Sequence, residues 1–314
     1  MKPSELTPLS ALMLAALFKE AGFPDGVLNV VTGYGHTAGQ ALVEHPLVGK
    51  VAFTGSTLIG RKIMETAAKT NLKRVTLELG GKSPAIVFDD ADISQAVKWI
   101  VGNVLYVTSQ FTWLSVTGIL RLFCVDSHHN GQICTAPTRL FVQEGVHQAF
   151  LDAFTAAAKS LKHGDTFDRG VQQGPLVSNQ QLDVCRASYP QNILLNWLQR
   201  VLGYIEHGKR EGARLVAGGE RYDRPGFFIR PTIFTDVKPD MKIVREEIFG
   251  PVAVVVKFKS EEEVIDMAND TDYGLSSYVF TQNVNIAIRV ANALEAGNTF
   301  VRARSTWCIS CDAN

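Results

Sequence analysis

Short apolar runs alternate along this chain with segments whose apolar residues recur at helical spacing. The runs typical of buried strands are LNVVTG (28–33), KVAFTG (50–55), VTLELGG (75–81), AIVF (85–88), AVVVKFK (253–259) and SYVFTQ (277–282). The helical segments are residues 7–24, 41–46, 56–70, 92–102, 260–270 and 283–297, and Ser260 with Glu263 has the pattern of a capping box. This alternation predicts an α/β fold with largely parallel sheets.

The first helical segment, TPLSALMLAALFKEAGFP, carries its own start and stop signals. Thr7 is the predicted N-cap, Gly22 the C-terminal stop, and Pro24 lies just beyond it. The apolar centre resembles the core of a signal peptide, but charged residues flank it and no small-residue cleavage site follows. It is also too short to span a bilayer. We therefore expect no targeting segment.

Composition narrows the class of protein. The chain has 314 residues, of which 46% are hydrophobic and 20% charged, with a formal net charge of zero. A chain of this size can bury a core and form more than one domain. The neutral balance argues against nucleic-acid or anionic-membrane partners, which need basic patches. Five cysteines without regular spacing do not form a disulfide framework, so a reducing, cytoplasmic location is expected.

Two glycine clusters are candidates for holding phosphate. GYGHTAG (33–39) follows a predicted strand, but its glycine spacing is one residue too long for a dinucleotide fingerprint, and a turn leading into a helix is the alternative. FTGSTLIG (53–60) fits better: Gly55 lets the backbone approach an anion, and Ser56 stands at the start of a helix. Any capped helix after a strand has a similar pattern, so this cluster alone is only suggestive.

Three reactive side chains stand in contexts that suit catalysis. Cys134 lies in the loop-like NGQICT; on its own, a single cysteine is more often a buried apolar filler. Glu78 ends the run VTLELGG, where strand ends present catalytic groups, although a cap or an ion pair is the ordinary role of such a residue. Glu247 in REEIFGP precedes a Gly-Pro turn, and a carboxylate there can accept both hydroxyls of a ribose.

Several motifs, taken in order, resemble the aldehyde dehydrogenase superfamily. They are KPSELTPLSAL, EAGFPDGVLNVVTG, VAFTGST, VTLELGGKSP, GQICT, QGPLVS and EEIFGPV, and they cover the chain from Lys2 to about Phe300. The resemblance implies a partial Rossmann-like cofactor domain (1–79) followed by an α/β catalytic domain (80–301). It also implies oxidation of an aldehyde to a carboxylic acid, with Cys134 as the nucleophile that forms a thiohemiacetal and then a thioester. Glu78 would activate the water that releases the acid, and the backbone N–H of Cys134 would help to hold the oxyanion.

The same resemblance implies a set of cofactor contacts. By motif, the ribose contacts are Lys2, Glu5 and Glu247, the pyrophosphate site is Gly55 and Ser56 with Gly60 closing the turn, and Phe249 packs near the nicotinamide. A carboxylate at Glu5 repels a 2′-phosphate, which favours NAD, with NADP as the alternative. The expected partners are a small-molecule aldehyde and, as in the family, further copies of the chain.

Three segments depart from the family pattern. They are residues 107–128, residues 184–199, where Tyr189-Pro190 interrupts a helix, and the tail 302–314. Each begins at or directly after a valine, whose codons start with the bases that begin introns, so one hypothesis is that these segments are translated, unspliced introns. The tail contains CISC (308–311), the spacing of half a zinc site, but there is no second pair, so no metal site is predicted.

A second functional hypothesis follows from these departures. The family's N-terminal strands, the asparagine that completes its oxyanion hole and part of its oligomer interface have no counterpart here. The chain is then a catalytically inactive family fragment with at most a binding role, and its exposed strand edges predict aggregation.

Overall fold

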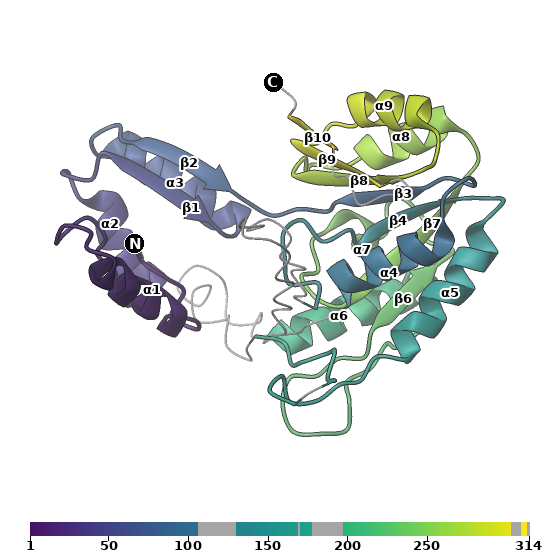
Figure 1. The fold of residues 1–314 in the computed structure, drawn as a ribbon, viewed down its shortest axis with the longest axis horizontal. Helices are drawn as coiled ribbons and strands as arrows, with labels where there is room; N and C mark the ends of the chain where they lie inside the picture. Colours follow the sequence, from purple (N-terminus) through teal and green to yellow (C-terminus); the bar gives the residue numbers. More distant parts are fainter. Residues whose placement is uncertain (106–129, 169, 178–196, 303–308, 313–314) are drawn as a thin grey trace. The chain divides into compact units, whose positions relative to one another are not determined.

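The computed structural model describes residues 1–105, 130–168, 170–177, 197–302 and 309–312, with the backbone alone at 197–199, 302 and 309–312. The chain divides into two compact units between Gly80 and Gly81. Most of the three departing segments (107–128, 184–199 and 302–314) lies outside the described residues. We describe each unit by itself, and Figure 1 gives the labels of their helices and strands.

The first unit pairs two parallel strands beside a small set of helices. Its elements are α1 (Leu9–Glu20), the π-helical turn η1 (Gly35–Gly39), α2 (Gln40–Glu44), β1 (Lys50–Thr54), α3 (Thr57–Lys69) and β2 (Arg74–Glu78). Strand β1 pairs with β2 from Lys50 opposite Arg74 to Thr54 opposite Glu78. The connection through α3 is the strand, helix and parallel strand unit that the sequence pattern predicted.

Helix α1 ends as predicted but begins one residue late. Gly22 has a φ of +80° and donates its N–H to Lys19, while the Phe23 N–H reaches back to Phe18. The rings of Phe18 and Phe23 lie 4.7 Å apart, which is the apolar contact that accompanies this type of helix end. The prediction of Thr7 as the N-cap is wrong, because Pro8 occupies that position without a side-chain cap, and no residue of this fully described helix is buried.

The run LNVVTG does not form a strand, which corrects the sequence-based prediction. Within the described part of this unit, its backbone contacts are with the N-terminus: Met1 donates its ammonium to the carbonyl of Asn29 at 2.5 Å, and the Val31 N–H donates to the carbonyl of Met1 at 2.9 Å. A strand is stabilised by an adjacent strand, and the only sheet described in this unit consists of β1 and β2.

The second unit is built on a mostly parallel sheet. Among the described residues its strand order is β10-β9-β8-β3-β4-β7-β6-β5. The strands are β3 (Pro84–Val87), β4 (Arg139–Gln143), β5 (Arg214–Ala217), β6 (Thr232–Thr235), β7 (Val252–Phe258), β8 (Ser276–Phe280), β9 (Asn298–Arg302) and β10 (Ile309–Asp312). The two outermost pairs, β5 with β6 and β9 with β10, are antiparallel, and the other pairs are parallel. The predicted α/β class is therefore confirmed.

Helices cover both faces of this sheet. Successive residues of β3 pack against helices on opposite faces. Ala85 and Val87 belong to the buried cluster that includes helices α4 (Ile93–Val104) and α5 (His147–Lys159). Ile86 and Phe88 belong to the opposite cluster, with α8 (Glu261–Asn269) and α9 (Val284–Ala293). A third cluster packs α6 (Trp197–Arg210) and α7 (Lys242–Arg245) against β6 and β7. Because both faces are covered, these strands are continuously apolar rather than alternating.

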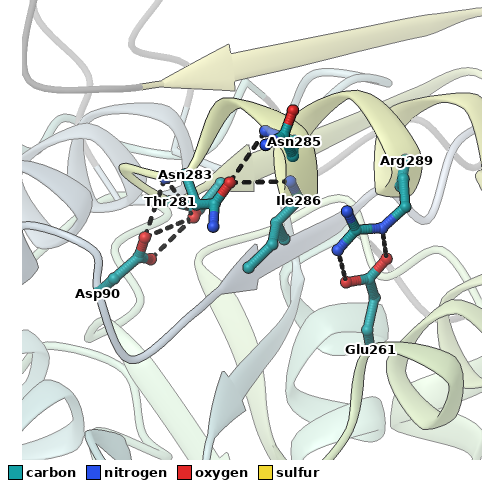
Figure 2. A network of polar contacts seen from close by, with 7 residues as sticks. All are labelled: Asp90, Glu261, Thr281, Asn283, Asn285, Ile286 and Arg289. Atoms are coloured by element: carbon teal, nitrogen blue, oxygen red, sulfur yellow. Dashed lines mark hydrogen bonds and ion pairs between the residues drawn. The ribbon is translucent and has the colours of Figure 1, made fainter.

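A polar network ties the end of β3 to the start of α9 (Figure 2). The carboxylate of Asp90 accepts the Thr281 hydroxyl at 2.8 and 2.9 Å and the N–H groups of Gln282 and Asn283 at 2.9 Å each. Asn283 is in turn the N-cap of α9. Glu261 and Arg289 join α8 to α9 through a two-pronged ion pair at 2.9 and 2.7 Å. These contacts fix two loops at the carboxyl ends of neighbouring parallel strands.

Asp90→Ala is expected to destabilise the second unit by about 1–3 kcal/mol, since it removes the carboxylate that accepts one hydroxyl and two backbone N–H groups. Urea unfolding followed by circular dichroism measures the change. Asp89→Ala is the matched control, because Asp89 is exposed and, among the described residues, its side chain makes no hydrogen bond. Equal stability of the two variants contradicts this role for Asp90.

Candidate functional site

The loop that carries Cys134 runs into the amino end of β4. It begins with a tight turn in which Asn130 and Gly131 have φ angles of +55° and +70°. The Tyr278 hydroxyl donates to the carbonyl of Thr135 at 3.0 Å, and the Ala136 N–H donates to Ile133 at 3.1 Å. These bonds hold the loop with its half-buried Cys134 near the amino end of β4.

Buried amides hold this turn from the side. Asn130 is fully buried and Gln173 is 1% exposed. The Gln173 amide donates to Oδ1 of Asn130 at 3.0 Å and to the carbonyl of Ile229 at 2.9 Å. The QGP stretch was noted in the sequence only for its family resemblance, and its contact with the Cys134 loop was missed because the two segments are far apart along the chain.

Two glycines let three chain segments meet at this loop. A Cβ on Gly81 would lie 2.0 Å from the carbonyl oxygen of Cys134, and a Cβ on Gly131 would lie 2.0 Å from the carbonyl oxygen of Gly250. Both distances are far below contact, so only glycine permits this backbone packing. Gly81 also donates its N–H to Oε1 of Glu247 at 3.0 Å. One glycine thus lies between the candidate nucleophile's backbone and the candidate ribose-binding carboxylate.

Glu247 is half-buried in a braced loop. Burial raises the pKa of its carboxyl group, and the hydrogen bond from the Gly81 N–H opposes that shift. Arg200 donates to the backbone carbonyl of Glu247 at 3.1 Å, and the hydroxyl of Tyr204 donates to the neighbouring Glu246 at 2.5 Å. A carboxylate held in this way can accept hydroxyl groups from a ligand.

Phe249 follows on the same loop in a strained conformation. Its φ is +60°, a left-handed value that is a true outlier for an aromatic residue. Such strain costs about 1–3 kcal/mol and clusters at functional sites, which makes the loop a site candidate on backbone grounds alone. Asn130, on the Cys134 loop, also has a positive φ, but asparagine adopts this conformation readily.

In the first unit, the candidate phosphate site is a strand, a turn and a helix start. The Gly55 N–H donates to the carbonyl of Glu78 at 3.0 Å, and the Ser56 side chain caps α3 by accepting from Ile59 at 3.4 Å. A helix start of this kind presents backbone N–H groups that can bind an anion. Glu78 itself is exposed at the last position of β2.

Gly60 lies within α3, and its part in the pyrophosphate site stays a prediction. It lies inside the first turns of α3, and a Cβ there would come within 2.7 Å of a methyl group of Leu79. It therefore permits the helix to pack closely against the end of β2.

Lys2 and Glu5 lie together near the first glycine cluster. The Lys2 ammonium donates to the carbonyl of Gly33 at 2.9 Å and lies 3.6 Å from the Glu5 carboxylate. The cluster forms η1, which leads into α2, so the turn-to-helix reading of GYGHTAG describes its geometry. Whether this cluster contacts a cofactor remains a prediction.

The predicted residues thus fall into groups within each unit. Cys134, Glu247 and Phe249 lie on two packed loops of the second unit. The groups in the first unit are Lys2 with Glu5, and Gly55, Ser56 and Gly60 with Glu78. Within the described ranges, no cluster of His, Cys, Asp or Glu has the arrangement of a metal site, and no helix is long and apolar enough to cross a membrane.

The family model and the most similar proteins that we compared all point to one family. The profile described as "Aldehyde dehydrogenase family" matches residues 1–115 and 124–308; it omits 116–123, within the first departing segment, and runs through 184–199. "Aldehyde dehydrogenase" from Agaricus bisporus is 51% identical over 306 residues, covering 98% of this chain and 54% of that protein. "Aldehyde dehydrogenase, cytosolic 1" from Rattus norvegicus is 45% identical, covering 99% of this chain and 54% of that protein.

A solved structure is similar along nearly the whole chain. The NAD+ complex of aldehyde dehydrogenase from Bacillus cereus is 44% identical with a TM-score of 0.80, covering 96% of this chain and 53% of that one. The chain therefore spans about half the length of the relatives that it matches.

Proposed function

Because the chain belongs to the aldehyde dehydrogenase family, we propose that it carries the cysteine-based machinery for oxidising an aldehyde to a carboxylic acid. The observation that carries the proposal is the convergence at Gly81, whose N–H binds Glu247 and whose missing side chain makes room for the backbone of Cys134. These contacts support the proposal that Cys134 is the nucleophile and Glu247 the ribose-binding carboxylate, because both residues meet at Gly81.

In this mechanism the Cys134 thiolate attacks the aldehyde carbon, and the oxyanion that forms accepts a hydrogen bond from the Cys134 backbone N–H. Bound NAD⁺ supplies the hydride acceptor. Glu78 takes a proton from the water that attacks the resulting thioester, and the carboxylic acid leaves as the thiolate is regenerated.

The residues present fit a dinucleotide. Gly55 and the capped start of α3 suit a pyrophosphate, and the carboxylates of Glu5 and Glu247 suit ribose hydroxyls. Glu5 disfavours the 2′-phosphate of NADP, although Lys2, 3.6 Å away, offsets part of its charge. We therefore propose NAD as the cofactor, with NADP as the less favoured alternative.

The alternative is a catalytically inactive family fragment with a binding role. One observation favours it: the fully described helix α1 buries none of its residues, and Leu9 and Met13 are 78% and 67% exposed. Apolar surface of this kind favours association or aggregation. We also propose that the chain associates with further copies of itself, lies in the cytoplasm and has no nucleic-acid or membrane partner.

Turnover of an aldehyde by the purified chain separates the two functions. With propanal and NAD⁺, the enzyme reading expects NADH absorbance to rise in proportion to protein and propanoate to accumulate. A cooperatively unfolding chain that forms no NADH, even as a single-turnover burst, supports the fragment reading and contradicts catalysis by this chain.

A further inference from the structure

The backbone around Cys134 forms a turn (residues 133–136, the Cys134 turn) that one hydrogen bond closes. The Ala136 N–H donates to the carbonyl of Ile133 at 3.1 Å. This bond makes Cys134 and Thr135 the two central residues of the turn. No peptide bond among the described residues is cis, so the carbonyl and the N–H of each peptide lie on opposite sides. The Ile133 carbonyl is bonded inside the turn, and the Cys134 N–H, which belongs to the same peptide, is therefore directed out of it.

The last peptide of the Cys134 turn is held by a side chain from another strand. The Tyr278 hydroxyl donates to the carbonyl of Thr135 at 3.0 Å. That carbonyl belongs to the peptide whose N–H, from Ala136, closes the turn. Because the peptide is trans, a hydroxyl that holds its carbonyl also directs its N–H toward Ile133. One hydrogen-bonded path thus leads from Tyr278 through two peptides to the Cys134 N–H.

The sheet fixes the position of the Tyr278 ring. Strand β8 lies between β3 and β9, and Tyr278 pairs with Ala85 on one side and with Phe300 on the other. Its ring lies 5.1 Å from the Phe300 ring, tilted by 17°, and 6.1 Å from the ring of Trp99 on α4. The residue is 4% exposed. A ring packed in this way presents its hydroxyl in one direction, and a buried phenol hydroxyl usually finds a hydrogen-bond partner.

The middle peptide of the Cys134 turn is enclosed by backbone. A Cβ on Gly81 would lie 2.0 Å from the carbonyl oxygen of Cys134, so the two segments are in close contact there. Contacts therefore act on the carbonyls of Ile133, Cys134 and Thr135 in turn. Of these three contacts, only that of Tyr278 is made by a side chain. Its hydroxyl can be removed without any change to the backbone.

We propose that Tyr278 is a positioning residue that orients and polarises the Cys134 N–H toward the oxyanion of the reaction. This inference rests on the proposed function, in which that N–H stabilises the tetrahedral intermediate. Hydrogen bonds linked in a chain polarise one another, so a bond at the Thr135 carbonyl strengthens the donor at the far end of the path. A donor that is already oriented also needs no reorganisation when the negative charge forms. Tyr278 acts on the reaction through the Cys134 turn.

Tyr278→Phe removes the hydroxyl and keeps the ring. With propanal and saturating NAD⁺, we expect single-turnover NADH formation to slow by about 5–30-fold, which is less than the ~10²–10³-fold that loss of an oxyanion donor itself costs. The KM for NAD⁺ should stay within about twofold, because the lost interaction acts on the transition state. Alkylation of Cys134 by iodoacetamide, followed by peptide mass spectrometry, should also stay within about twofold, because attack on a saturated carbon forms no oxyanion.

Ser277→Ala is the matched control. It removes a buried hydroxyl from the neighbouring position of the same strand, where the hydroxyl bonds Thr299 at 2.8 Å and not the Cys134 turn. We expect this variant to form NADH at the wild-type rate. Urea unfolding followed by circular dichroism checks that both variants are folded.

The amide resonance of Cys134 supplies a readout that needs no activity. In protein labelled with ¹⁵N-cysteine, this resonance is identified by its absence from the spectrum of Cys134→Ser. In Tyr278→Phe the amide proton should move upfield, because a less polarised N–H is less deshielded. In Ser277→Ala it should keep its wild-type position.

If the wild type is active, an unchanged rate in Tyr278→Phe overturns the positioning role. A slower rate without an upfield shift, or with an equal loss of alkylation, also overturns it. If Tyr278→Phe does not fold, Phe300→Leu replaces it, because it loosens the ring that Tyr278 stacks on; a smaller loss of rate is expected, and an unchanged rate contradicts the proposal. A wild type that forms no NADH overturns the proposed function instead, and the amide shift then decides whether Tyr278 acts on the Cys134 N–H.

Discussion

Cys134→Ser is expected to lower NADH formation from an aldehyde by on the order of 10⁴-fold or more, because a serine hydroxyl is not ionised at neutral pH and nothing else supplies the nucleophile. The substitution removes only sulfur and leaves the loop's backbone bonds in place, so stability should hardly change. The measurement is single-turnover NADH formation with each protein at equal concentration.

Glu78→Gln distinguishes the two chemical steps. If Glu78 activates water, this variant should release about one equivalent of NADH in a burst and then turn over about 10²–10⁴-fold more slowly. Mass spectrometry should find an acyl group on the peptide that contains Cys134. Glu65→Gln is the matched control, since Glu65 is an exposed residue of α3 paired with Lys69. Full activity of Cys134→Ser, or acylation at another residue, contradicts the mechanism.

Arg139→Met is expected to destabilise the second unit by about 3–5 kcal/mol. Methionine fills much of the arginine volume but leaves the carbonyls of Lys82, Met267 and Ala268 without their donor in a buried place. Two of these carbonyls lie near the C-terminal end of α8, where a cation is also favoured by the helix dipole. The arginine therefore connects α8 to the start of β4.

Urea unfolding monitored by circular dichroism measures this loss, with Arg210→Met as the control. Arg210 is exposed in the last turn of α6, so its replacement should change the free energy of unfolding by less than about 0.5 kcal/mol. Equal midpoints for the two variants would contradict a structural role for the buried guanidinium.

Hydrophobic periodicity predicted the α/β class and most of the elements it addressed, because strand and helix patterns are local. It succeeded at α8, where the Ser260 side chain accepts from the Glu263 N–H at 3.2 Å. The Glu263 carboxylate, however, accepts from Lys259 at 2.7 Å and not from Ser260 as in the standard capping box. It failed at LNVVTG, because an apolar run becomes a strand only when another strand pairs with it.

In the candidate site, motifs in the sequence pick out the reactive residues, but only the fold shows how they contact one another. Cys134, Glu78 and Glu247 were identifiable from residue type and motif, because thiols, carboxylates and glycine turns carry local signals. The contacts of Gly81 with Glu247 and with Cys134 join residues far apart along the chain, so no local pattern could reveal them.

Lys82 is the clearest example of a property that the sequence does not predict and the fold creates. In the printed sequence it is an ordinary lysine after two glycines, which most often denotes a solvated surface charge. Folding leaves it 2% exposed, with its backbone carbonyl bonded to Arg139. Periodicity therefore predicted the fold class, and the ordered motifs carried the resemblance to the family and to its reactive residues. The burial of this charge arose only when distant strand ends were brought together, because desolvation depends on every neighbour in space.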